Sequence, residues 1–167
     1  MKRALDVLAV LVIAYAGYRI FLAPRYLNVA SAHPEPHVTY QTLSGKPFVL
    51  TAHRGRVVFL DFWASWCEPC KLSLPLVESF ARSHPEVDVV PVDVGEPRTV
   101  VEQFARSHGM RHVALDPQTL SQGFFQINGF PTMVVIDPQG RIRATWAGFN
   151  PAIQMNMAHA EETLRSS

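Results

Sequence analysis

The sequence predicts an α/β sandwich with a mixed central sheet, preceded by one N-terminal apolar segment. Between residues 56 and 109, short apolar runs alternate with stretches typical of helices, which is the pattern of strand–helix–strand units with parallel strands. Two later apolar runs flank Asp137-Pro-Gln-Gly140 and indicate an antiparallel hairpin. Only the N-terminal segment is apolar over a length that can cross a bilayer.

The N-terminal segment begins with Lys2 and Arg3 and continues as a mostly apolar stretch over residues 4–23. About 20 apolar residues in a helix span a bilayer, and the preceding cations favour a cytoplasmic N-terminus. We therefore expect residues 1–23 to be a single-pass transmembrane anchor in the cell membrane. The alternative is a signal peptide cleaved at the small residues 30–32. Both interpretations place the remaining chain on the extracytoplasmic, periplasmic side.

Residues 24–37 contain three prolines and several small polar residues, a composition typical of a linker. The folded domain is then expected over residues 38–167. It begins with two short alternating segments around Ser44-Gly45, and this pattern predicts an N-terminal hairpin.

The remaining elements of the domain follow from apolar runs and from helix start and stop signals. A continuous apolar run predicts a strand in the middle of a sheet covered on both faces. Proline opens helices and glycine ends them. In chain order, we expect a buried strand at 56–64, a helix from about Cys67 to Ser83 kinked at Pro75, a strand at 87–94, a helix at 96–109, a short strand at 111–116, a helical turn or two at 119–127, a hairpin of 132–137 with 141–148, and a last helix at about 151–165.

The charge distribution excludes one class of partner. From residue 33 onward, eleven Lys and Arg stand against thirteen Asp and Glu. No basic stripe remains that would bind phosphates, so we expect no nucleic-acid partner.

Cys67 and Cys70 are the only two cysteines of the chain. A Cys-x-x-Cys pair can form a redox disulfide, supply half of a zinc site or bind Cu(I). Structural zinc requires four ligands, and the sequence has no second pair. His108 and His112 are four residues apart, but Gly109 interrupts any helix between them. A purely structural disulfide across so short a loop would stabilise the fold little. The sequence favours redox chemistry and leaves Cu(I) binding as the alternative.

The position of the pair also favours redox chemistry. Cys67 follows a buried strand and lies where a helix begins, so free N–H groups and the helix dipole stabilise its thiolate. Cys70 lies one turn further on the same face, within reach of a disulfide. We expect Cys67 to be solvent-exposed and Cys70 to be less so. Pro69 between them fixes the first turn.

Two separated motifs carry a family resemblance. The segment "DFWASWCEPCK" at 61–71 resembles the active-site segment of the thioredoxin superfamily, and "GFPT" at 129–132 resembles the cis-proline loop of that superfamily. The leading hairpin, the strand–helix insert at 87–110 and the N-terminal anchor narrow the resemblance to the membrane-anchored TlpA, ResA and CcmG branch. The resemblance covers about residues 38–165 and implies a thioredoxin-like fold.

The resemblance implies roles for the site residues. Cys67 would be the attacking thiol and Cys70 the resolving thiol, with Pro131 in the cis form against the disulfide. Asp61 would be the proton acceptor for Cys70, because a carboxylate buried in a central strand has a raised pKa.

The same resemblance implies a client-binding surface beside the disulfide. Phe130 and Thr132 flank the cis-proline and lie in the loop that would receive an extended client peptide. Trp66 would shield one side of the disulfide.

Three features depart from the relatives or adjust the site. ResA-like proteins carry a glutamate at the position of Ser73, and thioredoxin carries a lysine in the strand that here reads "VVPVDV" at 89–94. Asp61 would therefore lack a cationic partner. Glu68 adds a negative charge that should raise the pKa of Cys67 modestly, since exposed charges are screened.

The function implied is that of a membrane-anchored thiol-disulfide oxidoreductase that reduces disulfides in client proteins and is itself reduced by an upstream membrane dithiol donor. Clients in cytochrome c or oxidase assembly follow by family analogy. No cofactor and no resident metal are implied. The alternatives are a Cu(I)-binding metallochaperone of the same fold, and a disulfide oxidase that uses the same site.

Overall fold

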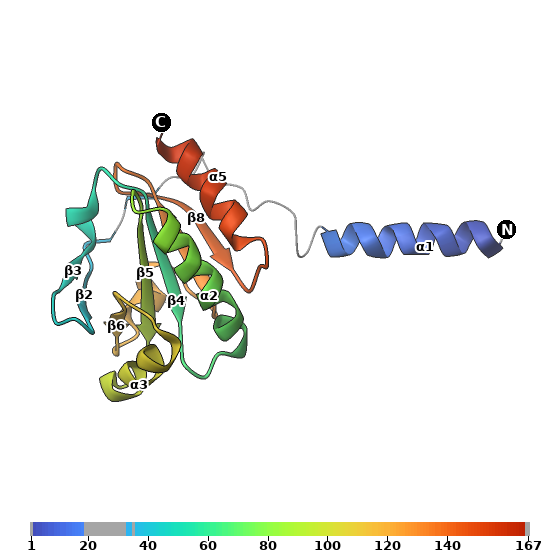
Figure 1. The fold of residues 1–167 in the computed structure, drawn as a ribbon. Coiled ribbons are helices and arrows are strands. Elements are labelled where there is room, and N and C mark those ends of the chain that lie inside the picture. Colours follow the sequence, from blue (N-terminus) through green and yellow to red (C-terminus); the bar gives the residue numbers. More distant parts are fainter. Residues whose placement is uncertain (1, 19–32, 35, 166–167) are drawn as a thin grey trace.

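The central feature of the computed structural model, which describes residues 2–18, 33–34 and 36–165, is a mixed sheet (Figure 1). Its strands are β1 (His33–Pro34), β2 (Thr39–Thr42), β3 (Phe48–Val49), β4 (Val58–Trp63), β5 (Asp88–Val94), β6 (Ala114–Asp116), β7 (Thr132–Ile136) and β8 (Arg141–Ala147). Their order across the sheet is β1-β8-β7-β4-β5-β6-β2-β3. β4, β5 and β6 are parallel and the other pairs are antiparallel. The predicted mixed sheet and both predicted hairpins are confirmed.

One helix, α1 (Lys2–Gly17), precedes the domain. The helices of the domain follow the predicted order and are the 3-10 helix η2 (Leu50–His53), α2 (Glu68–Ser83), α3 (Arg98–His108), α4 (Leu120–Phe124) and α5 (Ile153–Arg165). η2 was not predicted from the sequence.

The N-terminal part of the prediction is described only in part. α1 covers 16 residues, whereas the anchor was expected over residues 4–23. Its last residues, and most of the predicted linker at 24–37, lie outside the described residues. Among the residues described, no helix combines the length and the apolar character needed to cross a membrane.

β4 is the buried centre of the domain. It pairs with β5 on one side and β7 on the other, and all six of its residues are buried. Val58, Leu60 and Phe62 contribute to the core on one face, and the intervening Phe59 and Trp63 contribute to the core on the other. The prediction of a central strand covered on both faces is confirmed.

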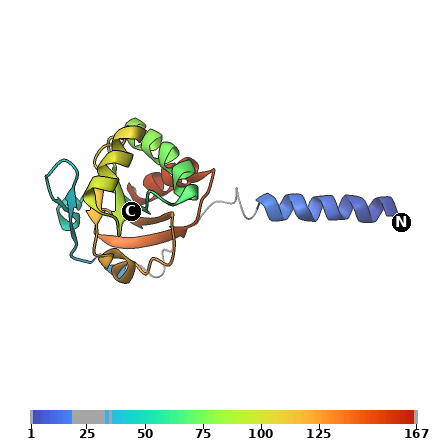
Figure 2. The same cartoon turned by 90° about the horizontal axis from the view of Figure 1, so that it is seen from below.

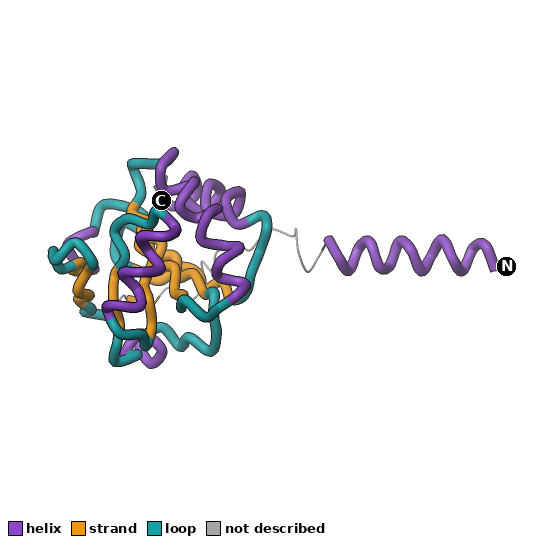
Figure 3. The backbone as a smooth tube through the Cα atoms, turned by 60° about the horizontal axis from the view of Figure 1, so that its bottom comes forward, coloured by secondary structure: helices purple, strands orange, loops and turns teal. Residues whose placement is uncertain are grey.

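The helices form the outer layers. α2 and α5 pack on the Phe59 face of the sheet, where Val77, Phe80 and Met157 fill the core between them. Figure 2 shows α2, α3 and α5 together on one side of the sheet, and Figure 3 shows the strands enclosed by helices and loops.

The predicted N-terminal hairpin extends the sheet at its β6 edge. β2 pairs antiparallel with β6, with Gln41 opposite Leu115, and Arg98 of α3 donates to the carbonyl oxygen of Leu43 at 2.8 Å. The hairpin therefore contacts the strand–helix insert, a long-range pairing that local sequence patterns do not specify.

One edge of the sheet gathers three connections. The parallel strands β4 and β5 end there, and β7 begins there, with Phe62 opposite Thr132. Loops at the carboxyl ends of parallel strands are the usual place for a functional site in open α/β folds. The loops that follow β4 and β5 and the loop that precedes β7 meet at this edge.

Candidate active site

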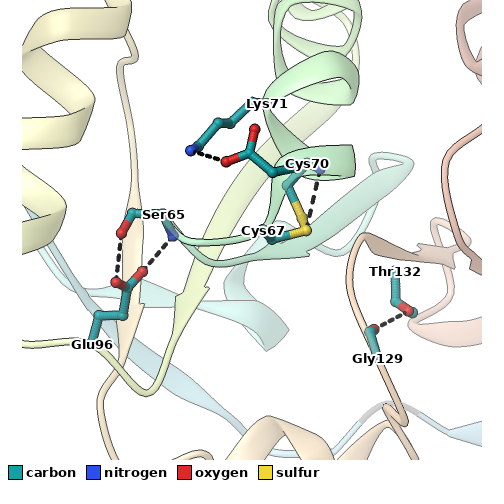
Figure 4. Close-up of a disulfide and its surroundings, with 8 residues drawn as sticks. Ser65, Cys67, Cys70, Lys71, Glu96, Gly129 and Thr132 are labelled. Atoms are coloured by element: carbon teal, nitrogen blue, oxygen red, sulfur yellow. Dashed lines mark hydrogen bonds and ion pairs between the residues drawn. A yellow bond between two sulfur atoms is a disulfide. The ribbon is translucent and has the colours of Figure 1, made fainter.

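The two cysteines form a disulfide at the start of α2 (Figure 4). Their Cα atoms lie 5.2 Å apart. Cys67 is the N-cap residue of α2, and its sulfur accepts a hydrogen bond from the backbone N–H of Cys70 at 3.2 Å. Pro69 lies in the first helical turn, where its missing N–H costs no hydrogen bond. The Cys67 sulfur thus lies among the free N–H groups of a helix N-terminus, which stabilise an anion.

Cys67 is far less exposed than its position in the sequence predicted. Its relative exposure is 4%, against 0% for Cys70. The order of exposure is as expected, but open exposure of Cys67 is wrong in this oxidised state. Both sulfurs belong to an apolar cluster with Trp63 and Leu74, and this packing covers Cys67.

The loop before β7 lies opposite the disulfide (Figure 4). The Phe130–Pro131 peptide bond is cis, as the family resemblance implied. Thr132 donates its hydroxyl hydrogen to the carbonyl oxygen of Gly129 at 2.7 Å, and the Gly148 N–H donates to the Pro131 carbonyl at 2.8 Å. These two bonds hold the loop on both sides of the cis bond.

Trp66 and Phe130 form an apolar surface beside the sulfurs. Trp66 is 66% exposed, and its ring meets that of Phe130 edge to face, with centroids 5.9 Å apart. Phe130 is half-buried and packs against the cluster that contains both cysteines. An exposed tryptophan in contact with a half-buried phenylalanine is a surface that a client can cover.

Asp61 lies inside the protein. It is 2% exposed, and among the described residues its Oδ2 atom has no hydrogen-bond partner. Burial, followed by the charge of Glu78, raises the pKa of Asp61 to about 7. Its neighbours across the sheet are Pro91 and Met133, so the neighbouring strands place no cation beside it. A carboxyl group with this pKa can exchange a proton near neutral pH.

A cavity of about 10 Å³ connects Asp61 with the cis-proline loop. Asp61, Ser73 and Pro131 all line it. Ser73 occupies the position where ResA-like proteins, by the resemblance, carry a glutamate. This chain therefore has an uncharged hydroxyl in the cavity that Asp61 lines.

The charge of Glu68 is partly neutralised. Its carboxylate accepts a hydrogen bond from the Lys71 ammonium at 2.6 Å on the exposed face of α2. This partner of Glu68 was not predicted from the sequence.

Sequence reasoning also missed Glu96, which lies in the loop after β5. Its carboxylate accepts hydrogen bonds from the backbone N–H and the hydroxyl of Ser65, two residues before Cys67. The signal was present, because an acidic residue follows a strand that ends at the same edge as β4. Within the part of the chain that is described, no group of three or more His, Cys, Asp or Glu side chains is arranged to hold a metal.

These features define a class of protein. A Cys-x-x-Cys disulfide at a helix N-terminus, opposite a cis-proline loop that shares a cavity with a buried carboxyl group, is the site of a thiol-disulfide oxidoreductase of thioredoxin fold.

Comparisons with known proteins agree with this class. A family model described as thioredoxin-like matches residues 55–142. The thiol-disulfide oxidoreductase ResA of Geobacillus thermodenitrificans is 30% identical, over 85% of this chain and 84% of that protein. ResA of Bacillus subtilis is 30% identical over 81% and 78% of the two chains. The chain therefore belongs to the thioredoxin-like family and is a thiol-disulfide oxidoreductase of the ResA-like kind.

Solved structures give the same result. A candidate thiol:disulfide interchange protein DsbE from Chlorobium tepidum matches with a TM-score of 0.74 and 26% identity, over 80% of this chain and 96% of that one. StoA from Bacillus subtilis matches with a TM-score of 0.62 and 27% identity, over 78% and 97% of the two chains.

Proposed function

We propose that the protein is a membrane-tethered reductase that works outside the cytoplasm, with Cys67 as the attacking thiol and Cys70 as the resolving thiol. The observation that carries this proposal is the N-cap position of Cys67, whose sulfur accepts the Cys70 N–H. A thiolate at this position is stabilised relative to one inside the helix.

The proposed reaction has two exchange steps. The Cys67 thiolate attacks one sulfur of a client disulfide, and the other client sulfur leaves as a thiolate that takes up a proton. Asp61 then accepts the proton of the Cys70 thiol, and the resulting thiolate attacks the Cys67 sulfur. The client leaves with two electrons and the protein is left with the Cys67–Cys70 disulfide. An upstream membrane dithiol donor returns the two electrons.

The client is proposed to lie across the Trp66 and Phe130 surface. The Gly129–Phe130 segment offers backbone groups to an extended peptide, and Thr132 keeps this segment in place through its bond to Gly129. Pro131 has no backbone N–H, so the peptide would find its donors on the residues before it.

Membrane attachment is proposed through residues 4–23. The side chains of residues 5–16 in α1 are all exposed in the described chain, and most of them are apolar. A helix that is apolar on all sides and has no protein cover favours a lipid environment. Lys2 and Arg3 precede it, which supports a cytoplasmic N-terminus and an extracytoplasmic, periplasmic domain.

Client proteins of cytochrome c or oxidase assembly are proposed by analogy with the branch that the sequence resembles. The net direction of electron flow depends on the reduction potential of the Cys67–Cys70 pair. Equilibration of the full-length protein with glutathione measures it. A value near thioredoxin's roughly −270 mV supports a reductase, and a value near DsbA's roughly −120 mV indicates an oxidase.

Covalent trapping tests the assignment of the two thiols. Cys70→Ala should accumulate a mixed disulfide between Cys67 and client, because the second step is blocked. Cys67→Ala should accumulate none. Equal trapping by the two variants would overturn the assignment, and non-reducing gels followed by peptide mapping measure it.

A further inference from the structure

Glu96 is hydrogen-bonded to the turn that precedes Cys67. Its carboxylate accepts the backbone N–H of Ser65 at 2.5 Å and the hydroxyl of Ser65 at 2.6 Å (Figure 4). Ser65 is the second residue of a turn closed by the bond from the Cys67 N–H to the Ala64 carbonyl at 3.1 Å. Hydrogen bonds to an ionised acceptor are stronger than neutral ones, and two on one residue fix its orientation.

The chain geometry after β5 explains why Glu96 reaches this turn. β4 and β5 are parallel and in register, with Trp63 opposite Asp93, so the two strands end side by side. Gly95 adopts a φ of 86°, in the left-handed region that favours glycine, and its N–H donates to the Asp116 carbonyl at 3.0 Å. This bend leaves Glu96 only 9% exposed.

Asp93, in β5, is a second buried acid and a neighbour of Glu96. It has no exposed surface, and among the described residues no side-chain or backbone donor is bonded to its carboxyl oxygens. The Glu96 carboxyl and backbone lie within hydrogen-bonding reach of it. Burial, and then its neighbour Glu96, raise the pKa of Asp93 to about 8. The charged groups that act on it, Glu96 from the following loop and Asp116 from β6, are both acids, and its partner on β4 is the uncharged Trp63.

These observations assign separate tasks to the two acids. A proton on Asp93 removes the charge repulsion between the two acids, and the Glu96 carboxyl group accepts the two hydrogen bonds from Ser65. Asp116 is already occupied, since it accepts the N–H groups of Leu120 and Ser121 at 3.1 and 2.8 Å.

We infer that Glu96 is a positioning residue for thiol-disulfide exchange. Its two hydrogen bonds to Ser65 keep the turn in place, so that Cys67 stays at the N-terminus of α2 and Trp66 stays beside Phe130. We also infer that these bonds persist only while Asp93 carries a proton. The inference rests on the proposed function in one respect, the assignment of Cys67 as the attacking thiol. Glu96 itself does not touch the reacting sulfurs and acts through Ser65.

The hydrogen bonds between Glu96 and Ser65 should weaken at alkaline pH. When Asp93 ionises, two neighbouring carboxylates are charged in a buried place, and their repulsion disfavours the position of Glu96 against Ser65. The hold on the turn should then weaken above about pH 8, the pKa of Asp93. A buried acid with only a packing role would not change the position of Ser65 at that pH.

The test measures the first exchange step on the reduced full-length protein. The probe is a glutathionylated cysteine peptide, and the rate of its mixed disulfide with the protein is followed from pH 6 to 10. The variants are Glu96→Gln, Ser65→Ala and Asp93→Asn. Glu102→Gln is the matched control, because its carboxylate pairs with Arg98 on the outer part of α3 at 2.7 Å. In parallel, NMR follows the Ser65 amide proton through the same titration.

We expect Glu96→Gln to react about tenfold more slowly than Glu102→Gln at pH 7, because a charged acceptor is replaced by a neutral one. Ser65→Ala keeps the amide bond and should lose about threefold. From pH 7 to pH 9, the wild-type rate should fall relative to Asp93→Asn by about threefold or more, and the wild-type Ser65 amide should titrate near pH 8 while that of Asp93→Asn does not.

Each outcome decides one assignment. If Glu96→Gln follows Glu102→Gln at every pH and its Ser65 amide resonates as in the wild type, Glu96 does not position the turn. If Asp93→Asn keeps the wild-type pH profile, Asp93 plays no part in the hold. Should Glu96→Gln fail to fold, Ser65→Ala and Asp93→Asn still decide between the two results. Peptide mapping of the wild-type mixed disulfide separates these failures from that of the proposed function. A peptide attached to Cys70 would overturn the assignment of the attacking thiol, whereas a peptide attached to Cys67 with unchanged rates in the variants would overturn only the role of Glu96.

Discussion

Asp61 and Asp137 are two carboxyl groups with nearly the same solvent exposure and opposite surroundings. Asp61 is 2% exposed and Asp137 is 1% exposed. Asp137 follows the last residue of β7, whereas Asp61 lies in β4 near the strand end that carries the active-site turn. Burial acts to raise the pKa of both groups, but only one of them is provided with donors and cations that oppose it.

The partners of Asp137 reverse the effect of burial. It accepts the Arg141 backbone N–H at 2.9 Å and the side chains of Arg141 and Arg143 at 2.8 and 3.0 Å. Burial alone would raise the pKa of Asp137, but the Arg141 backbone bond and the two guanidinium groups together lower it. Asp61 has no such cationic partners across the sheet and keeps a pKa of about 7. The carboxyl of Asp137, which has cationic partners, thus has a lowered pKa, and that of Asp61 has the raised pKa that proton exchange near neutral pH requires.

Asp137→Asn should give the largest loss of folding stability. The amide keeps an acceptor for the turn but leaves the Arg143 guanidinium, which is 5% exposed, without a counter-charge. Leaving one member of a buried ion pair uncompensated costs about 3–5 kcal/mol. Urea unfolding should show this loss as a lower midpoint with an unchanged slope.

The control for Asp137→Asn is Asp88→Asn. The Asp88 carboxylate pairs with Arg56 at 2.9 Å, where the arginine side chain is 41% exposed. A pair of this kind contributes about 0–1 kcal/mol. Equal losses in the two variants would mean that burial does not distinguish the two aspartates.

Asp61→Asn should change the free energy of unfolding in the opposite direction and stabilise the protein at neutral pH. The ordinary pKa of 3.8 in the unfolded chain is raised to about 7 in the folded protein, so the folded state binds the proton more tightly. Wild-type stability therefore falls as pH rises from about 4 to about 7 and stays low above it. Because asparagine does not ionise, the variant should equal the wild type below pH 4 and exceed it by about 2–4 kcal/mol above pH 8.

Urea midpoints measured at pH 4 and pH 8 check this difference. A variant that is less stable than the wild type at both values would show that Asp61 is held by favourable partners, and the comparison with Asp137 would fail.

The sequence predicted the parts of the site that depend on local patterns. The helix start at Cys67, the inward position of Asp61 by alternation in β4 and the strand that follows Pro131 all come from residues within a few positions of each other. The cis form of the Phe130–Pro131 bond and the roles of the two cysteines followed from the family resemblance.

The sequence did not predict contacts that depend on tertiary structure. Ser65 and Glu96 are 31 residues apart and meet only because β4 and β5 are parallel and in register. Arg143 turns inward because it is the extra residue of a register shift in β8. Ala144 pairs with Val135 of β7, and Ile142 pairs with Ile136. The burial of Cys67 depends on packing that its helix position does not specify.

Asp61→Asn should also slow the second exchange step. If Asp61 is the proton acceptor for Cys70, as proposed, resolution of the mixed disulfide should fall by about 10- to 100-fold at pH 7 in this variant. In the wild type this rate should rise with pH through about 7 as Asp61 ionises, and the asparagine variant should lack that inflection. Stopped-flow measurement of client release from the mixed disulfide gives both results.

Ser73→Ala is the matched control for this step, because Ser73 lines the same cavity and carries no charge. It should keep the inflection near pH 7. Loss of the inflection in Ser73→Ala, or its persistence in Asp61→Asn, would assign the proton to another group.

The smallest effect is expected for charges outside the protein interior. The Glu68 side chain is 79% exposed and bonded to Lys71 at 2.6 Å, so solvent and the lysine both screen its charge from Cys67. Glu68→Gln should raise the alkylation rate of reduced Cys67 at pH 7 by less than about threefold, and 1 M salt should abolish the difference, since the screening length then falls to about 3 Å. Lys71→Met removes the opposite charge from the same place and should lower the rate by a similar factor. A tenfold change in either variant that persists in high salt would mean that surface charge acts on this site as strongly as we expect of the buried carboxyl of Asp61.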